Sequence, residues 1–129
     1  MPYVADTHTL IWFLTGSSQL GQNALQIMRE SAAGREIIVI PTIVLGELMS
    51  LCEKGKTSLN FREVLTKIES GDNYRIVPLD LATLKAASQT LADLSMHDRF
   101  IIATAKTLNL PLLTRDQAIT QSGQVHTIW

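Results

Sequence analysis

The chain has 129 residues, of which 46% are hydrophobic and 18% charged, so we expect one folded domain spanning residues 1–129 rather than a disordered segment. The net charge of −1 excludes a chain that is basic as a whole, and the single cysteine, Cys52, excludes an internal disulfide or a cysteine-based zinc site. No apolar run approaches the roughly 20 residues of a membrane span, and no signal-peptide pattern is present. We therefore expect a cytoplasmic protein with no membrane partner.

Strand patterns and helix patterns alternate along the sequence. The first half predicts a strand around Val4, helices over 9–14 and 22–33, a strand over 37–40, and a helix over 42–54 with Thr42 as its N-cap. The second half predicts a helix over 61–69, a strand over 75–77, a helix from Asp80 through Leu84, Ala87, Leu91 and Leu94, a helix over 97–108, a strand over 111–113, a helical turn after Asp116 and an edge strand over 125–129. Such alternation is typical of an α/β fold with a mainly parallel sheet between two layers of helices, in which ligands bind at the carboxyl ends of the strands.

Four acidic residues stand in apolar surroundings where a carboxylate has little structural use. Asp6 ends the first strand, and Asp116 follows the strand over 111–113. Glu47 and Asp98 fall within the apolar stripes of predicted helices. Burying an unpaired carboxylate is costly, and four of them at one end of one sheet would be tolerated mainly around a metal ion.

Each of these acids also has a structural alternative. Asp6 and Asp116 could be N-caps at strand-to-helix turns, and Asp98 could interact with the dipole of its helix. Glu47 could form a buried ion pair with Arg99 or Arg115. We favour a site, because the alternatives require four coincidences at the same edge of the sheet.

A cluster rich in oxygen and free of thiolates suits Mg²⁺ or Mn²⁺ better than zinc. Two such ions can activate a water molecule and stabilise the leaving oxygen of a phosphodiester. His8 and His97 flank two of the acids and could serve as ligand or base, although a polar position at the rim is the favoured interpretation. Trp12 is expected in the core, and Trp129 is expected to anchor the last strand.

A basic stretch lies in the middle of the chain, and it is formed by Lys54, Lys56, Arg62 and Lys67. These side chains could contact RNA phosphates, or they could belong to an ordinary solvated surface. Because aromatic residues make up only 5% of the chain, the sequence indicates no obvious platform on which bases could stack.

Four segments together resemble the PIN-domain ribonucleases, and in particular the VapC-type toxins of prokaryotic toxin–antitoxin pairs. They are residues 4–12 (VADTHTLIW), 42–47 (TIVLGE), 97–105 (HDRFIIATA) and 113–116 (LTRD). The similarity covers nearly the whole chain in order, and its most specific parts surround Asp6 and Asp98. One departure is Met96-His97, where relatives often have Pro-Phe.

The resemblance implies an α/β/α sandwich and Mg²⁺- or Mn²⁺-dependent endonucleolytic cleavage of RNA. Asp6 and Asp98 would be the principal metal ligands, Glu47 and Asp116 would complete the acidic pocket, and Thr114 would orient a water molecule or the metal. It also implies a homodimer that is held inactive by a small antitoxin protein.

Three other functions remain alternatives at this stage. A catalytically weak PIN-like module could bind RNA or act as a scaffold. A receiver domain would need paired acids at the end of the first strand, where Asp6 stands alone, and a haloacid-type phosphatase would need an aspartate where His8 stands.

Overall fold

A five-stranded parallel sheet forms the centre of the structure, a computed structural model that describes residues 1–90 and 92–129. The strands are short and stand in the spatial order β3-β2-β1-β4-β5, and each neighbouring pair is parallel. Their bounds are β1 (Tyr3–Ala5), β2 (Ile38–Pro41), β3 (Tyr74–Val77), β4 (Leu112–Leu113) and β5 (Thr127–Ile128).

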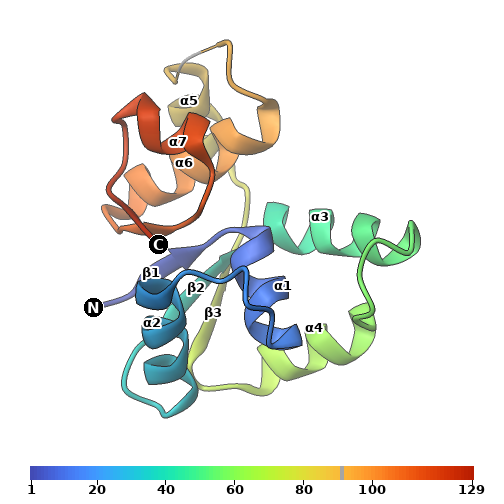
Figure 1. Ribbon diagram of the computed structural model, residues 1–129. Helices are drawn as coiled ribbons and strands as arrows, with labels where there is room; N and C mark the ends of the chain where they lie inside the picture. Colours follow the sequence, from blue (N-terminus) through green and yellow to red (C-terminus); the bar gives the residue numbers. More distant parts are fainter. Residues whose placement is uncertain (91) are drawn as a thin grey trace.

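Helices connect the strands and cover both sides of the sheet. Figure 1 shows α5, α6 and α7 gathered on one side and α1, α2 and α4 on the other. The helix bounds are α1 (Thr7–Thr15), α2 (Gln22–Ala32), α3 (Thr42–Glu53), α4 (Phe61–Ser70), α5 (Leu81–Ser88), α6 (Met96–Leu108) and α7 (Gln117–Ser122). The sequence prediction of an α/β fold is confirmed, and so is the order of its elements.

The sheet lies in the core because its central strands are apolar on both faces. The side chains of β2 and β4 are buried along their whole length, as expected for parallel strands that carry helices on both sides. Leu10 of α1, Leu48 of α3 and Ile101 of α6 are almost fully buried and pack into the same apolar cluster. Local sequence pattern and tertiary burial therefore agree in this part of the chain.

The helix predicted to run as far as Leu94 is shorter. It ends at Ser88, so Leu94 lies outside it, and Leu91 falls outside the described residues. Arg99 of α6 donates from its guanidinium to the carbonyl oxygen of Ala87 at 3.0 Å. The same carbonyl oxygen accepts hydrogen bonds from the N–H and the hydroxyl of Thr90, so a nearby residue and a side chain from α6 together close the end of α5.

The N-cap predicted for α3 is also wrong by one residue. Pro41 occupies the cap position, and Thr42 is the first residue of the helix. The Thr42 hydroxyl accepts a hydrogen bond from the Leu79 N–H at 3.0 Å, so it links α3 to the segment that follows β3.

The topology changes direction between β1 and β4. The chain builds the sheet outward from β1 through β2 to β3, and then crosses back to place β4 on the other side of β1. The carboxyl ends of two such strands border a crevice, where ligands of open α/β sheets bind. Ala5 pairs with Leu113 across this boundary, so the residues that follow them, Asp6 and Thr114, lie side by side.

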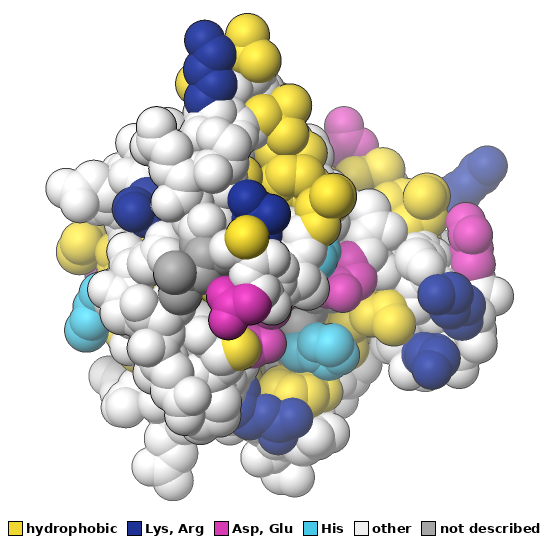
Figure 2. All heavy atoms as spheres, turned by 90° about the horizontal axis from the view of Figure 1, so that it is seen from above, with side chains coloured by type: hydrophobic (Ala, Val, Ile, Leu, Met, Phe, Trp, Pro, Cys, Tyr) yellow, Lys and Arg dark blue, Asp and Glu magenta, His cyan; other side chains and the backbone are white. Residues whose placement is uncertain are grey.

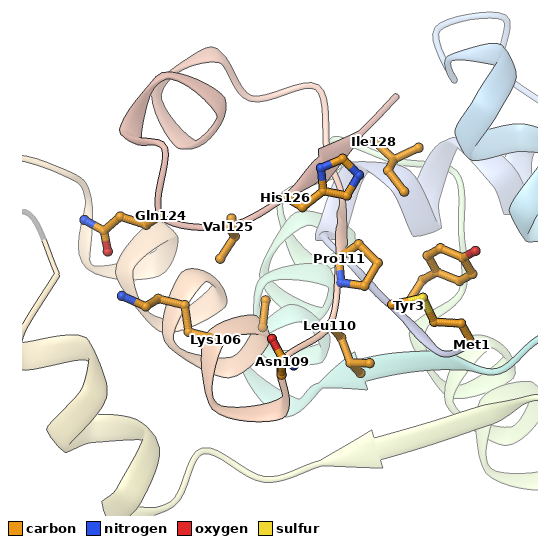
Figure 3. A pocket seen from close by; sticks show the side chains of 11 residues that line it. Met1, Tyr3, Lys106, Asn109, Leu110, Pro111, Gln124, Val125, His126 and Ile128 are labelled. Atoms are coloured by element: carbon orange, nitrogen blue, oxygen red, sulfur yellow. The ribbon is translucent and has the colours of Figure 1, made fainter.

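A hollow of about 620 Å³ lies near the amino ends of β1 and β4, at the end of the sheet opposite to Asp6 and Thr114 (Figure 3). Its lining residues are Met1, Tyr3, Ala105, Lys106, Asn109, Leu110, Pro111, Gln124, Val125, His126 and Ile128. None of the four predicted acids lines this hollow, so the predicted site does not lie in it. Across the described residues, no helix is both long enough and apolar enough to span a membrane.

Candidate active site

Asp6 is held rigidly at the end of β1. It is the N-cap of α1, where its Oδ1 accepts a hydrogen bond from the Thr9 N–H at 3.0 Å and lies 2.8 Å from the Thr9 hydroxyl. Its Oδ2 accepts a hydrogen bond from the hydroxyl of Thr114. Asp6 can therefore be both the N-cap of α1 and a residue of the site, because its carboxylate also faces the crevice beside β4.

Thr114 connects two of the acids. Its side chain is buried, with 1% of the residue exposed. Its hydroxyl donates to Asp6 and accepts a hydrogen bond from the Asp116 N–H at 3.1 Å. Asp116 in turn caps α7, since its Oδ1 accepts from the Ile119 N–H at 3.0 Å. This threonine, predicted to orient a water or a metal, positions the Asp6 carboxylate and the Asp116 backbone here.

Asp98 lies in the first turn of α6, which Ser95 caps by accepting a hydrogen bond from the Asp98 N–H. Its carboxyl group is partly buried. Burial first, and then the negative charge of Asp116, raise the pKa of Asp98 above its ordinary value; the hydrogen bond with Ser95 and the charge of His97 oppose this, and the charge of Glu47 adds a smaller increase. Like charges therefore meet across the crevice between α6, α7 and α3.

Glu47 of α3 pairs with His97 of α6, whose Nε2 lies 2.9 Å from Glu47 Oε1. Arg99 and Arg115, the partners considered in the structural alternative for Glu47, lie elsewhere: Arg99 donates to a carbonyl oxygen at the end of α5, and Arg115 lies over Trp12. The hydrogen bond from His97 lowers the pKa of Glu47, against partial burial, which raises it.

His97 is the residue of this site that sequence reasoning placed only at the rim. Burial lowers its pKa, but the hydrogen bond to Glu47 and the charges of Glu47, Asp98 and Asp6 outweigh this effect and raise the pKa of His97 overall. Its Nε2 also lies 3.4 Å from the Thr7 hydroxyl. The signal in the sequence was its departure from the Pro-Phe pattern directly before Asp98.

A small pocket opens beside Asp6 and Asp116. It has a volume of about 180 Å³, and His8, Trp12 and Arg115 complete its lining. Trp12, predicted in the core, is only half-buried and forms part of this wall. Figure 2 shows acidic side chains beside a histidine near the middle of the face seen from above.

The acids share a crevice without forming a closed metal cage. Among residues 1–90 and 92–129, no three His, Cys, Asp or Glu side chains stand close enough to hold an ion. The electrostatic effects on Asp98 and His97 nevertheless connect Asp6, Glu47, Asp98 and Asp116. The structure thus brings all four predicted acids to one edge of the sheet, whereas Lys54, Lys56, Arg62 and Lys67 lie exposed beyond the end of α3 and on α4.

Known proteins share this sequence pattern and fold. Residues 3–123 match the PIN domain family. Among solved structures, VapBC2 from Rickettsia felis, bound to a DNA fragment from its promoter, has 16% identity and a TM-score of 0.72, with 100% of this chain and 99% of that chain covered. A toxin–antitoxin complex from Klebsiella pneumoniae has 22% identity and a TM-score of 0.60, with 88% and 86% covered.

A third similar structure is VapC20 from Mycobacterium tuberculosis, described as a toxin that cleaves the sarcin–ricin loop. It has 15% identity and a TM-score of 0.69, with 94% of this chain and 95% of that chain covered. A comparison with functionally curated proteins finds no match. The receiver alternative is excluded by the strand order, because receiver domains have the order 2-1-3-4-5 and this sheet has 3-2-1-4-5.

Proposed function

This chain belongs to the PIN domain family, and we propose that it is a divalent-metal-dependent endoribonuclease that acts as the toxin of a toxin–antitoxin pair. The observation that carries the proposal is the grouping of acids at the carboxyl ends of β1 and β4: Asp6 and Asp116 line one pocket, and Asp98 lies near enough to Asp116 and Glu47 for their charges to affect its pKa. The pKa of Asp98 is raised first by burial and then by the charge of Asp116, so this carboxyl group lies near another negative charge. A cation would offset this charge.

The donor set suits a hard divalent cation, because it offers carboxylate oxygens and no thiolate. Asp6 and Asp98 would be the principal ligands of Mg²⁺ or Mn²⁺, with Glu47 and Asp116 completing the pocket. Such an ion would activate a water molecule and stabilise the leaving oxygen of the phosphodiester.

The protein itself supplies orientation. Thr9 and Thr114 hold the two oxygens of Asp6, so this carboxylate enters the crevice in one orientation. His97 holds one oxygen of Glu47. Preorganised groups of this kind lose little freedom when the reaction proceeds.

The toxin part of the proposal is supported by the fold shared with the Klebsiella pneumoniae toxin–antitoxin complex and with VapC20. A small antitoxin would be the natural inhibitor, and a homodimer the active form. Expression of the chain alone should arrest growth, and coexpression of a small protein encoded next to it should restore growth. Growth that continues unaffected by the chain would argue against a toxin.

The nuclease part is tested with purified protein and RNA. Cleavage should disappear in excess EDTA and return with Mg²⁺ or Mn²⁺, and Asp6→Asn should abolish it. Asp72→Asn serves as the matched control, because Asp72 is an exposed turn residue outside the crevice. Undiminished cleavage by a pure preparation in excess chelator would exclude the metal mechanism.

A catalytically weak RNA-binding module is the second candidate function. It is favoured by one observation: within the described part of the chain, the acids do not form a ready-made group of three around an ion. RNA binding without cleavage at saturating Mn²⁺ would support this module over the nuclease.

A further inference from the structure

The pocket beside the acids has two chemically different walls. Asp6 and Asp116 form one, while His8, Trp12 and Arg115 form the other. The second wall consists of two aromatic rings and a guanidinium, all of them planar. It therefore requires a different explanation from the acidic wall.

Arg115 is held over an aromatic ring rather than paired with a carboxylate. Its Cζ lies 4.4 Å from the centroid of the Trp12 ring, and its side chain is exposed. The ion pairs found among the described residues do not include it, although Asp6 and Asp116 line the same pocket. The oxygens of Asp6 are occupied by Thr9 and Thr114 instead. The donors of this guanidinium are consequently available to a ligand.

His8 extends the same surface. Its ring centroid lies 5.2 Å from that of Trp12, at an interplanar angle of 47°. Trp129 packs edge-on against the Trp12 ring at 5.8 Å and 67°, which fixes the position of Trp12 from behind. Trp12 is half-buried, whereas His8 and Arg115 are exposed. His8 and Arg115 therefore form a platform that Trp12 supports.

Planar aromatic side chains beside a guanidinium whose donors are unpaired are the features that bind an unpaired nucleotide. We propose that His8, Trp12 and Arg115 form a subsite for one unpaired nucleotide of the RNA substrate, in which the base stacks on His8 and Arg115 and the guanidinium donates to an adjacent phosphate. The subsite rests on the proposed ribonuclease function, because that function makes RNA the ligand of this crevice.

The position of Arg115 connects this subsite to the acids. It lies in the chain between Thr114, which holds Asp6, and Asp116, which caps α7. A nucleotide held by Arg115 therefore lies next to the acidic wall of the same pocket. In a duplex both faces of a base are covered by its neighbours, so the substrate must be unpaired at this nucleotide.

The proposal is tested by equilibrium binding in excess EDTA, with an unstructured eight-nucleotide RNA carrying a fluorophore and with the same strand in a duplex. Wild-type protein should bind the single strand more tightly than the duplex. Arg115→Met should weaken binding roughly 10-fold and reduce the salt slope by about 0.7, the value for one phosphate contact on a single strand. Arg115→Lys should keep the slope and lose most of the affinity, since lysine retains the charge without the plane.

Arg29→Met is the matched control, because Arg29 is an exposed arginine near the end of α2, which leads to the amino end of β2. His8→Phe should retain affinity and His8→Ala should lose roughly 10-fold. Trp12→Leu removes the aromatic support of the platform. If that variant does not fold, Trp12→Phe, which keeps an aromatic ring at this position, replaces it. Equal affinity of wild type, Arg115→Met and His8→Ala, or equal binding of single strand and duplex, would overturn the subsite.

Failure of the subsite is distinguishable from failure of the nuclease. If the RNA is never cleaved with Mn²⁺ but the variants lose binding as expected, the subsite stands and the proposed catalysis falls. If metal-dependent cleavage occurs and Arg115→Met leaves both KM and kcat unchanged, the catalysis stands and the subsite falls. A higher KM in Arg115→Met with little change in kcat would support both.

Discussion

The two halves of the acidic crevice are held in different ways. At the ends of β1 and β4, Asp6 and Asp116 are fixed by hydrogen bonds from Thr9, Thr114 and the first turn of α7. On the α3 and α6 side, Asp98 faces like charges and Glu47 depends on His97. We call these the hydrogen-bonded half and the charged half.

This difference indicates which of the four carboxylates gain most from a bound cation. Hydrogen bonds hold the carboxylates of Asp6 and Asp116 in one orientation. Burial and then the charge of Asp116 raise the pKa of Asp98, so its carboxyl group gains most from a cation. The four predictions below test this comparison, from the largest expected effect to the smallest.

The first prediction concerns metal binding and cleavage. Asp6→Asn and Asp98→Asn should each abolish both, because each removes a principal ligand from one half of the crevice. Glu47→Gln and Asp116→Asn should leave measurable Mn²⁺ affinity, lowered by about 10- to 100-fold, as expected for groups that act through another ligand. Calorimetric Mn²⁺ titration measures these affinities, and wild-type affinity in Asp6→Asn or Asp98→Asn would refute the assignment.

The second prediction is that substitutions in the two halves change stability in opposite directions without metal. Asp6→Asn should lower the free energy of unfolding by about 1–3 kcal/mol, because it disrupts hydrogen bonds from Thr9 and the buried Thr114. Asp98→Asn should have a Tm equal to or above that of wild type at pH 7. Thermal unfolding in EDTA measures both.

The pH dependence of Asp98→Asn provides the control. The pKa of Asp98 is higher in the folded protein than in the unfolded chain. The contribution of Asp98 to stability is therefore fully present below its unfolded pKa of about 3.9, and it is lost as the pH rises through its pKa in the folded protein. The Tm advantage of Asp98→Asn should therefore appear near neutral pH and disappear below about pH 3.9. A clear loss of stability in Asp98→Asn at pH 7 would show that its role at the N-terminus of α6 dominates.

The third prediction concerns the ion pair in the charged half. His97→Phe should lower stability by about 1 kcal/mol or less, since the pair is partly exposed. The lowered pKa of Glu47 makes its contribution present above about pH 4.3 and lost as the pH falls through the folded value. The raised pKa of His97 makes its contribution present below about pH 6.5 and lost as the pH rises through the folded value.

The difference in Tm between wild type and His97→Phe should thus be largest between about pH 4.3 and 6.5. His126→Phe is the matched control, because His126 is exposed at the opposite end of the sheet. A difference in Tm that is independent of pH would mean that packing, rather than charge, accounts for the role of His97.

The fourth and smallest effect is expected outside both halves. If the basic stretch formed by Lys54, Lys56, Arg62 and Lys67 contacts RNA phosphates, replacing all four by glutamine should weaken RNA binding and flatten its salt dependence. In Figure 2, basic side chains are scattered over the face, and those at the right-hand end of the molecule stand beside an acidic side chain. An unchanged salt slope would identify the stretch as ordinary solvated surface.

The sequence by itself determined the order of the strands and helices and the positions of the four acids. These features depend on neighbours within one or two turns, such as the apolar run before Asp6 and the helical spacing around Asp98. Helical spacing failed at the end of α5, which was predicted too late. The helix ends at Ser88, and the Ala87 carbonyl oxygen accepts hydrogen bonds from Thr90 and from Arg99 of α6.

Only the tertiary structure decided how the acids are held. The hydrogen bond from Thr114 to Asp6 joins residues 108 positions apart, and that between Thr7 and His97 joins residues 90 apart. The stacking of Arg115 over Trp12 likewise depends on the alignment of β4 beside β1. Side-chain periodicity indicates which face of an element is buried, but the register between elements arises only when the whole core packs, and that register sets these contacts.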